Sequence, residues 1–351
     1  MTKKMKTSLD VQKFFENDLK QKLAVLEQRR LQVIQRYSFK PYRTTLKVLA
    51  LLDVFAIITS MAFPASPLRW FTLLIPFTAV VALAYPVVLW IVRASRFKVI
   101  NRSYKKEIIP ELLHFIHPAL KYNPEQGIPR RGVDDSLLFD AAYGTYRSED
   151  LVEGAIGDVY VKLADATLQR KSHSGRNSGV VTIFSGLFCQ IDLNRQFFSH
   201  TIIEPDIRDG MTIKLVKKIF GDEATDIIEQ IGKKIESLAG GLIEMGDPRF
   251  DRYFSVSTHD ERETRTLLTP SVMSKIADFR ERIDQIIHVS FTNQHMNLAI
   301  DAPDMFEGGV EESFQTFDNF RDYIEALLLT LSLVEEIEPM GQKETIAQGV
   351  R

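Results

Sequence analysis

Hydrophobic and polar positions divide the chain into a charged N-terminal arm, a strongly apolar stretch and a long mixed segment. Residues 70–92 contain no charged side chain. As a helix they would extend about 34 Å, enough to cross a hydrocarbon core of about 30 Å. Residues 44–63 form a second apolar run, and the proline-bearing turn at 64–67 joins the two runs closely. This pattern predicts a two-helix transmembrane hairpin over residues 44–92.

Asp53 is the acidic residue of the apolar run 44–63. One carboxylate at the centre of a membrane helix costs about 2.5–3.5 kcal/mol, and less toward an end. Asp53 follows Lys47 by six residues, which places it near the inner shoulder of the bilayer. Two spans make no obvious ion pathway, so we expect Asp53 to form a hydrogen-bonded contact within the hairpin or between protomers.

Charge predicts the orientation of the hairpin. Lysine and arginine outnumber acidic residues before the first span, and basic residues also follow the second span from Arg93 to Lys106, whereas the connecting turn carries only Arg69. Because basic flanks stay on the cytoplasmic side, both ends of the chain are expected to be cytoplasmic.

Residues 1–43 are predicted to form a basic amphipathic helical arm. Apolar side chains recur at helical spacing at Leu19, Leu23, Leu26 and Val33, with Arg30 in the missing position of the stripe. Three arrangements fit this pattern: a short coiled coil, a helix on the anionic inner leaflet, or a helix packed on the chain's own soluble domain. The hairpin or this arm could also join copies of the chain in a homo-oligomer.

The segment 93–337 mixes helical periodicity with strand-like alternation, which predicts a cytoplasmic α+β domain with mainly antiparallel sheet and flanking helices. Residues 338–351 are predicted to be a flexible tail. Helices are predicted at 97–120, 134–142, 222–238, from Thr269-Pro270 onward and at 317–336. Strands are predicted at 154–169, 180–193, 201–203, 252–258, 265–268, 286–291 and 296–300, the last two as a hairpin, with an exposed polar loop at 171–179.

Composition and charge exclude several function classes. The net charge of −2 argues against nucleic acid as a partner. The single cysteine, Cys189, lies in an apolar run and is predicted to be a small buried residue rather than a zinc ligand. Phosphate-binding, dinucleotide-binding, zinc-protease, esterase and calcium-loop motifs are all missing from the sequence. We therefore predict no metal site, no cofactor and no catalytic residue.

A few residues remain as weak candidates for chemistry. His114 and His117 could share a face of one helix, but a surface or interface position fits them better. His173 falls in the predicted exposed loop, and the charged cluster 259–263 is best explained as a solvated turn. The aromatic run 184–188 is assigned to the core rather than to a binding groove.

A series of short motifs follows the predicted hairpin in a fixed order: 149–154, 184–188, 201–206, 268–273, 290–291 and 304–307. In this order they resemble the bacterial membrane-protein family catalogued as domain of unknown function 3137, with the likeness extending over about residues 90–335. The resemblance implies a membrane-anchored cytoplasmic domain at the bacterial inner membrane. It brings no catalytic residue and no activity with it.

Three functions fit these observations. The first is a membrane-anchored adaptor or scaffold whose cytoplasmic domain binds a protein partner. The second is a sensor for a small ligand or lipid headgroup, which would need convergent polar groups in an apolar site. The third is an enzyme without a familiar motif, which would need converging ionisable residues with perturbed pKa values.

Overall fold

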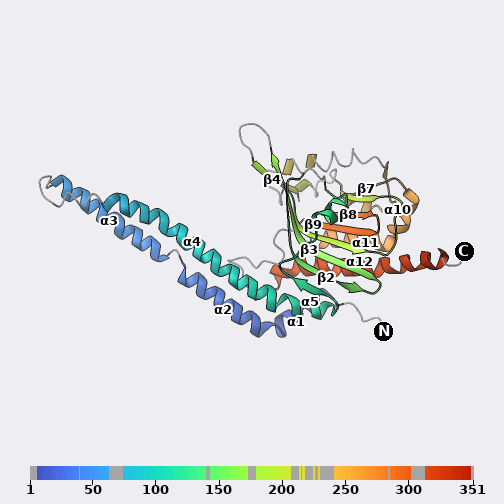
Figure 1. Ribbon diagram of the computed structural model, residues 1–351, viewed down its shortest axis with the longest axis horizontal. Helices are drawn as coiled ribbons and strands as arrows, with labels where there is room; N and C mark the ends of the chain where they lie inside the picture. The colour runs from blue at the N-terminus through green and yellow to red at the C-terminus, as the bar shows by residue number, and fades with distance from the viewer. Residues whose placement is uncertain are drawn as a thin grey trace. The chain divides into compact units, whose positions relative to one another are not determined.

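The computed structural model describes residues 6–38, 40–62, 74–139, 143–172, 179–206, 213–214, 216–217, 224–225, 228–229, 241–283, 285–301 and 313–348 (Figure 1). The chain separates into two compact units. The first comprises Met1–Leu19, Lys105–Gly308 and Thr316–Arg351, and the second comprises Lys20–Tyr104 and Gly309–Gln315.

Two apolar helical stretches are long enough to cross a membrane, Tyr42–Ala62 and Val80–Ile116. The first lies in α3 (Lys40–Ala62) of the second unit, and the second begins in α4 (Leu74–Glu107) and continues past this unit. Only 6% of each apolar window is buried in the structure. Tyr42 joins the two helices: its hydroxyl donates to the carbonyl of Ala82 at 2.6 Å, and its ring stacks on Tyr85.

The helix α2 (Lys20–Arg36) explains why arginine occupies the apolar stripe at position 30. Arg30 is buried and donates two hydrogen bonds, of 2.7 and 3.0 Å, to the carboxylate of Glu27. Glu27 in turn accepts from the backbone N–H of Phe314 at 3.1 Å, and the Phe314 ring stacks on Tyr104. A buried arginine is tolerated here because its charge is paired and its donors are used.

The first unit is a mixed α/β domain built on one antiparallel sheet, and the predicted antiparallel pairing is confirmed. Within the described residues the sheet has nine strands in the order β1-β2-β3-β4-β9-β8-β5-β7-β6. Its strands are β1 (Lys121–Asn123), β2 (Thr145–Ile156), β3 (Val159–Ser172), β4 (Gly179–Asp192), β5 (Thr201–Pro205), β6 (Gly241–Ile243), β7 (Phe254–Thr258), β8 (Ile287–Thr292) and β9 (His295–Asp301). The predicted hairpin is β8–β9, and Asn293 in its turn has a φ of +55°, a conformation that asparagine tolerates well.

Helices cover one face of the sheet, with α11 (Pro270–Ile283) packed beside α12 (Asp318–Gln348). The Thr330 hydroxyl of α12 lies 3.6 Å from the sulfur of Cys189 in β4. On α1 (Ser8–Asn17), Phe14 stacks on Phe115 of α5 (Ile109–Ile116), with 4.1 Å between ring centroids. The helix α1 therefore packs on the mixed α/β domain, whereas the stripe that suggested the three arrangements lies mainly on α2, for which they stay predictions.

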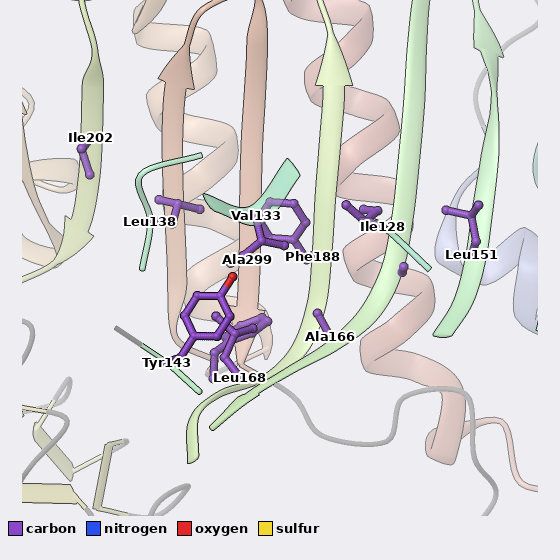
Figure 2. Close-up of a cluster of buried hydrophobic side chains, with 12 residues drawn as sticks. Ile128, Val133, Leu138, Tyr143, Leu151, Ala166, Leu168, Phe188, Ile202 and Ala299 are labelled. Atoms are coloured by element: carbon purple, nitrogen blue, oxygen red, sulfur yellow. The ribbon is translucent and has the colours of Figure 1, made fainter. Parts of the chain in front are cut away.

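The opposite face carries a hydrophobic cluster that Figure 2 shows in front of the strands, with the helices behind them. Sheet residues such as Ala166, Phe188 and Ala299 contribute to it. Ile128, Val133, Leu138 and Tyr143, which lie outside the strands, pack on these sheet residues. Among the described residues, the short segment 128–139 therefore contributes to the cover of this face.

Some predicted elements differ in the structure. The strand predicted at 265–268 is wrong: these residues follow the capping pair Asp260–Glu263 into α10 (Glu261–Leu267). Of the helix predicted at 134–142, residues 134–139 are described: they form the end of α6 (Arg130–Asp134) and turns, and Leu137 has a φ of +58°, which a continuous helix does not allow.

Two other helices have different limits. The helix predicted at 97–120 is interrupted between α4 and α5, where Pro110 starts a new first turn. The helix predicted at 317–336 continues to Gln348, into the segment expected to be a tail. The first two residues of the strand predicted at 252–258 belong to the short helix α9 (Phe250–Tyr253), and the rest of it forms β7. The connecting turn at 64–67, most of the loop 171–179 and most of the helix 222–238 lie outside the described residues.

Candidate functional site

Three ionisable side chains meet inside the mixed α/β domain: Glu204 of β5, His288 of β8 and Asp301 at the end of β9. β8 lies between the other two strands in the sheet, so its histidine reaches a carboxylate on either side. His288 Nδ1 lies 2.5 Å from Glu204 Oε2, and its Nε2 lies 3.3 Å from Asp301 Oδ2. All three residues are buried. We refer to them as the buried triad.

Burial and charge compete at the buried triad. Burial alone would lower the pKa of His288, but the carboxylates of Glu204 and Asp301 outweigh it and raise that pKa to about 9. For Asp301 burial dominates, and its pKa is raised despite the neighbouring imidazole. Within the described part of the chain, Asp301 Oδ1 has no hydrogen-bond partner. The triad therefore contains a buried acceptor that is ready for a donor.

The surroundings of the triad are aromatic and apolar. The ring of Phe139 lies 5.9 Å from that of His288 and 4.8 Å from that of Phe184, between centroids. On the same face, Ala299 is the register partner of His288. Ser290, two residues along β8, donates its hydroxyl hydrogen to the carbonyl of Ser136 at 2.6 Å. Such a site can hold a proton or bind a hydrogen-bond donor, and the Ser290 hydroxyl already has a structural role.

A second feature lies at the end of the sheet where β4, β5, β8 and β9 turn. The loop 193–200 is joined to two neighbouring turns by hydrogen bonds: the Asn194 side chain donates to the carbonyl of Asp158, and the Phe197 N–H donates to that of Asn293 at 2.6 Å. Asn194 and Asn293 both have positive φ values. We call the turns 157–158 and 293–294 with the loop 193–200 the loop platform.

Phe198 projects from this platform with 89% of its surface exposed. Its backbone is nevertheless held: the N–H groups of Phe198 and Ser199 donate to the two oxygens of Glu263, at 3.2 and 3.0 Å. The preceding Phe197 is buried, and its ring packs edge-on against Phe291. The platform therefore presents one aromatic side chain from an anchored backbone.

Several residues singled out in the sequence can now be placed. Asp53 accepts hydrogen bonds of 2.9 and 3.1 Å from the Thr78 hydroxyl, which places its predicted contact between α3 and α4. Cys189 is fully buried, as predicted, and burial raises its pKa to about 12. His114 is exposed and His117 ends α5. Within the described residues, no three histidine, cysteine or acidic residues are grouped so as to hold a metal ion.

The charged cluster, the aromatic run and His173 were the other candidates from the sequence. The charged cluster 259–263, predicted to be a solvated turn, supplies the cap of α10 and the Glu263 anchor of the loop platform. Phe184 and Phe188 of the run 184–188 lie in the core, as expected. His173 lies outside the described residues.

Sequence reasoning did not find the buried triad. A signal was present, because Glu204, His288 and Asp301 each belong to or directly follow a run predicted as a strand. A charged side chain in such a run is a candidate for a buried pair. What the sequence could not show is that β8 lies between β5 and β9.

Comparison with known proteins covers part of the chain. No curated protein and no solved structure matches it. The matched part of a family model runs from β4 to α12 and includes all three residues of the buried triad. The resemblance predicted from the motif order is thus confirmed over this range: residues 182–338 match the family described as "Protein of unknown function (DUF3137)".

Proposed function

We propose that this chain is an integral protein of the bacterial inner membrane, with α3 and α4 as a transmembrane hairpin and both termini in the cytoplasm. The exposed apolar surface of both helices supports the proposal. So does the contact between Asp53 and Thr78, because it gives the one acidic group of α3 a partner. The basic residues on both outer flanks set the orientation. Association into homo-oligomers through the hairpin or the arm stays a prediction.

Labelling of single cysteines tests this topology. In a Cys189→Ser background, Ser66→Cys places a thiol in the connecting turn and Gln28→Cys places one on the exposed side of α2. A membrane-impermeant maleimide added to right-side-out vesicles should label position 66 at once, and position 28 only after permeabilisation. Labelling of both positions before permeabilisation contradicts the orientation.

The mixed α/β domain acts, in our proposal, as an adaptor that binds a protein partner, and Phe198 on the loop platform carries this conclusion. Burying an exposed phenylalanine contributes about 1.5–3 kcal/mol, the contribution expected of a hot-spot residue. Its anchored backbone reduces the conformational entropy lost on binding. Aromatic side chains on loops held by a rigid scaffold are typical of protein-binding surfaces.

Affinity isolation of the full-length protein from native membranes in mild detergent tests the adaptor. Three forms are compared: the unaltered chain, Phe198→Ser and Val180→Ser. Val180 is the matched control, because it is also an exposed apolar residue of the same domain but lies at the end of β4 opposite to the loop platform. A near-stoichiometric protein should accompany the unaltered chain and Val180→Ser and fall about tenfold or more with Phe198→Ser. Equal recovery with all three forms, or no partner at all, refutes the adaptor.

A further inference from the structure

The apolar helix α4 contains a proline, Pro86, in its interior. In an α-helix the carbonyl of each residue accepts a hydrogen bond from the N–H four residues later, and proline has no N–H. The carbonyl of Ala82 therefore lacks this donor, and the proline ring crowds it. An apolar setting makes an unsatisfied carbonyl costly, because no water replaces the missing donor.

The neighbouring helix α3 supplies the donor that the proline lacks. The Tyr42 hydroxyl donates to the carbonyl oxygen of Ala82 at 2.6 Å. The ring of Tyr42 also stacks on that of Tyr85, with 5.4 Å between centroids and 16° between the ring planes. A side chain of α3 thus completes the backbone hydrogen bonding of α4 at the position where the proline interrupts it.

A second interruption of the helices lies close to the same contact. The helix α2 ends at Arg36 and α3 begins at Lys40, so the chain leaves the helical path between them. Tyr42 follows this break within the first turn of α3. The first chain crossing into the transmembrane hairpin is therefore broken near Tyr42, and the second contains Pro86. We call Tyr42 and residues 82–86, with the break between α2 and α3, the helix joint.

On either side of the helix joint the helices are fastened to each other. On the hairpin side, the Thr78 hydroxyl of α4 donates to the carboxylate of Asp53 in α3. On the other side, Phe314 links α2 to α4, because its N–H donates to Glu27 and its ring stacks on Tyr104. The helical unit therefore consists of two fastened pairs that meet at the joint: the hairpin, and a cytoplasmic helix pair formed by α2 and the part of α4 after Pro86.

The length of α4 makes a small bend at the joint large at its far end. After Pro86 the helix continues to Glu107, for about 21 residues or about 32 Å. Sharp kinks of more than about 20° are typical of proline sites in helices. A bend of about 20° at Pro86 would displace the far end of α4 by about 11 Å. The hydrogen bond from Tyr42 thus opposes a large displacement.

We propose that the helix joint is a latched hinge between the transmembrane hairpin and the cytoplasmic helix pair. While the Tyr42 hydroxyl is bonded to Ala82, α4 keeps one direction. When α3 shifts against α4, the hydroxyl leaves the carbonyl, α4 bends at Pro86 and the cytoplasmic helix pair tilts. A change in the packing of the two spans is thereby transmitted to the cytoplasmic side. The inference rests on the proposed position of α3 and α4 in the membrane, which the labelling of positions 28 and 66 tests separately.

The distance between two spin labels in the full-length protein, reconstituted in lipid nanodiscs, tests the hinge. In the Cys189→Ser background, Gln28→Cys and Leu51→Cys place labels at exposed positions of α2 and α3, on opposite sides of the joint. Their separation of about 23 residues, or about 35 Å along the helices, suits double electron–electron resonance. A closed latch should give a single narrow distance distribution.

Tyr42→Phe removes the hydroxyl and keeps the ring that stacks on Tyr85. It should shift or broaden the distribution by about 3 Å, because a label about 8 Å from the helix axis moves by about that much in a bend of about 20°. Pro86→Ala restores an N–H four residues after Ala82, so Tyr42→Phe should have no effect in that background. Tyr85→Phe is the matched control, since it makes the same chemical change on the stacked ring, and it should leave the distribution unchanged.

The proposal is overturned if Tyr42→Phe gives the distance distribution of the unaltered chain. It is also overturned if Tyr42→Phe has an equal effect in the Pro86→Ala background, because Tyr42 then acts through packing and not through the Ala82 carbonyl. Circular dichroism checks the folding of each variant. If Tyr42→Phe alone does not fold, the double variant decides: restored folding supports the latch, and failure of both variants overturns it.

Discussion

The buried ion pair between Lys105 and Asp150 provides the sharpest prediction about stability. Lys105 Nζ lies 2.6 Å from Asp150 Oδ2, and the side chains are 10% and 1% exposed. The Tyr122 hydroxyl donates to the other carboxylate oxygen. Asp150 lies in a bulge of β2 with a φ of +62°, a conformation that asparagine also tolerates. Asp150→Asn therefore changes the charge while keeping the backbone and the shape.

The expected loss of folding stability follows from the burial of this ion pair. In Asp150→Asn the side-chain amide oxygen can still accept the hydrogen bond from the Tyr122 hydroxyl. The Lys105 ammonium, however, loses the carboxylate it pairs with in a buried position. Removing one partner of a buried pair costs about 3–5 kcal/mol. Lys105→Met should cost a similar amount. The double variant should be more stable than the sum of the two single effects predicts, because neither charge is then left behind.

Cys189 makes the measurement possible in the full-length protein in detergent. It is the single cysteine, it is fully buried in β4, and it reacts with a maleimide only when the sheet opens. When the open state recloses faster than it is labelled, the labelling rate reports the free energy of opening, and each 1.4 kcal/mol changes it about tenfold. Asp150→Asn should therefore raise the labelling rate by about two to three and a half orders of magnitude.

Glu149→Gln supplies the matched control. Glu149 precedes Asp150 on the same strand, and its pair with Arg147 is exposed, with side-chain exposures of 36% and 73%. An exposed pair contributes about 0–1 kcal/mol, so the labelling rate should change by less than about fivefold. If Asp150→Asn behaves like Glu149→Gln, the Lys105–Asp150 pair is solvated and the reasoning from burial is wrong.

Three further predictions concern other contacts. His288 has a pKa raised from 6.5 to about 9, so its contribution to stability is complete below about pH 6.5 and is lost as the pH rises through about 9. Thermal unfolding should show this decline, and His288→Gln should flatten it. Thr78→Val should weaken the association of α3 and α4 by about 1 kcal/mol, measured by steric trapping in bilayers, whereas Asp53→Leu with Thr78→Val should restore it. Glu263→Gln should speed amide hydrogen exchange at Phe198 and Ser199, because their N–H groups lose a charged acceptor.

Features that depend on local periodicity were predictable from the sequence. The two apolar helices, the long strand β4 and the β8–β9 hairpin follow directly from runs of apolar or alternating residues. The contact of Asp53 was also predictable in kind, since a charged group in an apolar helix needs a partner. Which residue is the partner of Asp53 was not predictable, because the contact with Thr78 depends on how α3 and α4 align.

Features that depend on irregular geometry or distant pairing were not predictable. The first half of β2 was missed because the bulge between Glu149 and Val152 interrupts the alternation. β1 was missed because it is a three-residue strand of polar composition at the edge of the sheet. The buried triad depends on strand order, since Glu204 and His288 are 84 residues apart in the chain. No local pattern encodes such a pairing.

The buried ionic contacts of the described residues also provide a comparison for the triad. Glu27 with Arg30 and Lys105 with Asp150 each match one acid with one base. Such pairing is what a structural role requires, because each buried charge is costly unless it is compensated. The triad departs from this rule by placing two carboxylates around one imidazole. Burial raises the pKa of Asp301, and a proton on Asp301 leaves one carboxylate facing one imidazole, which gives the triad the same one-to-one pairing.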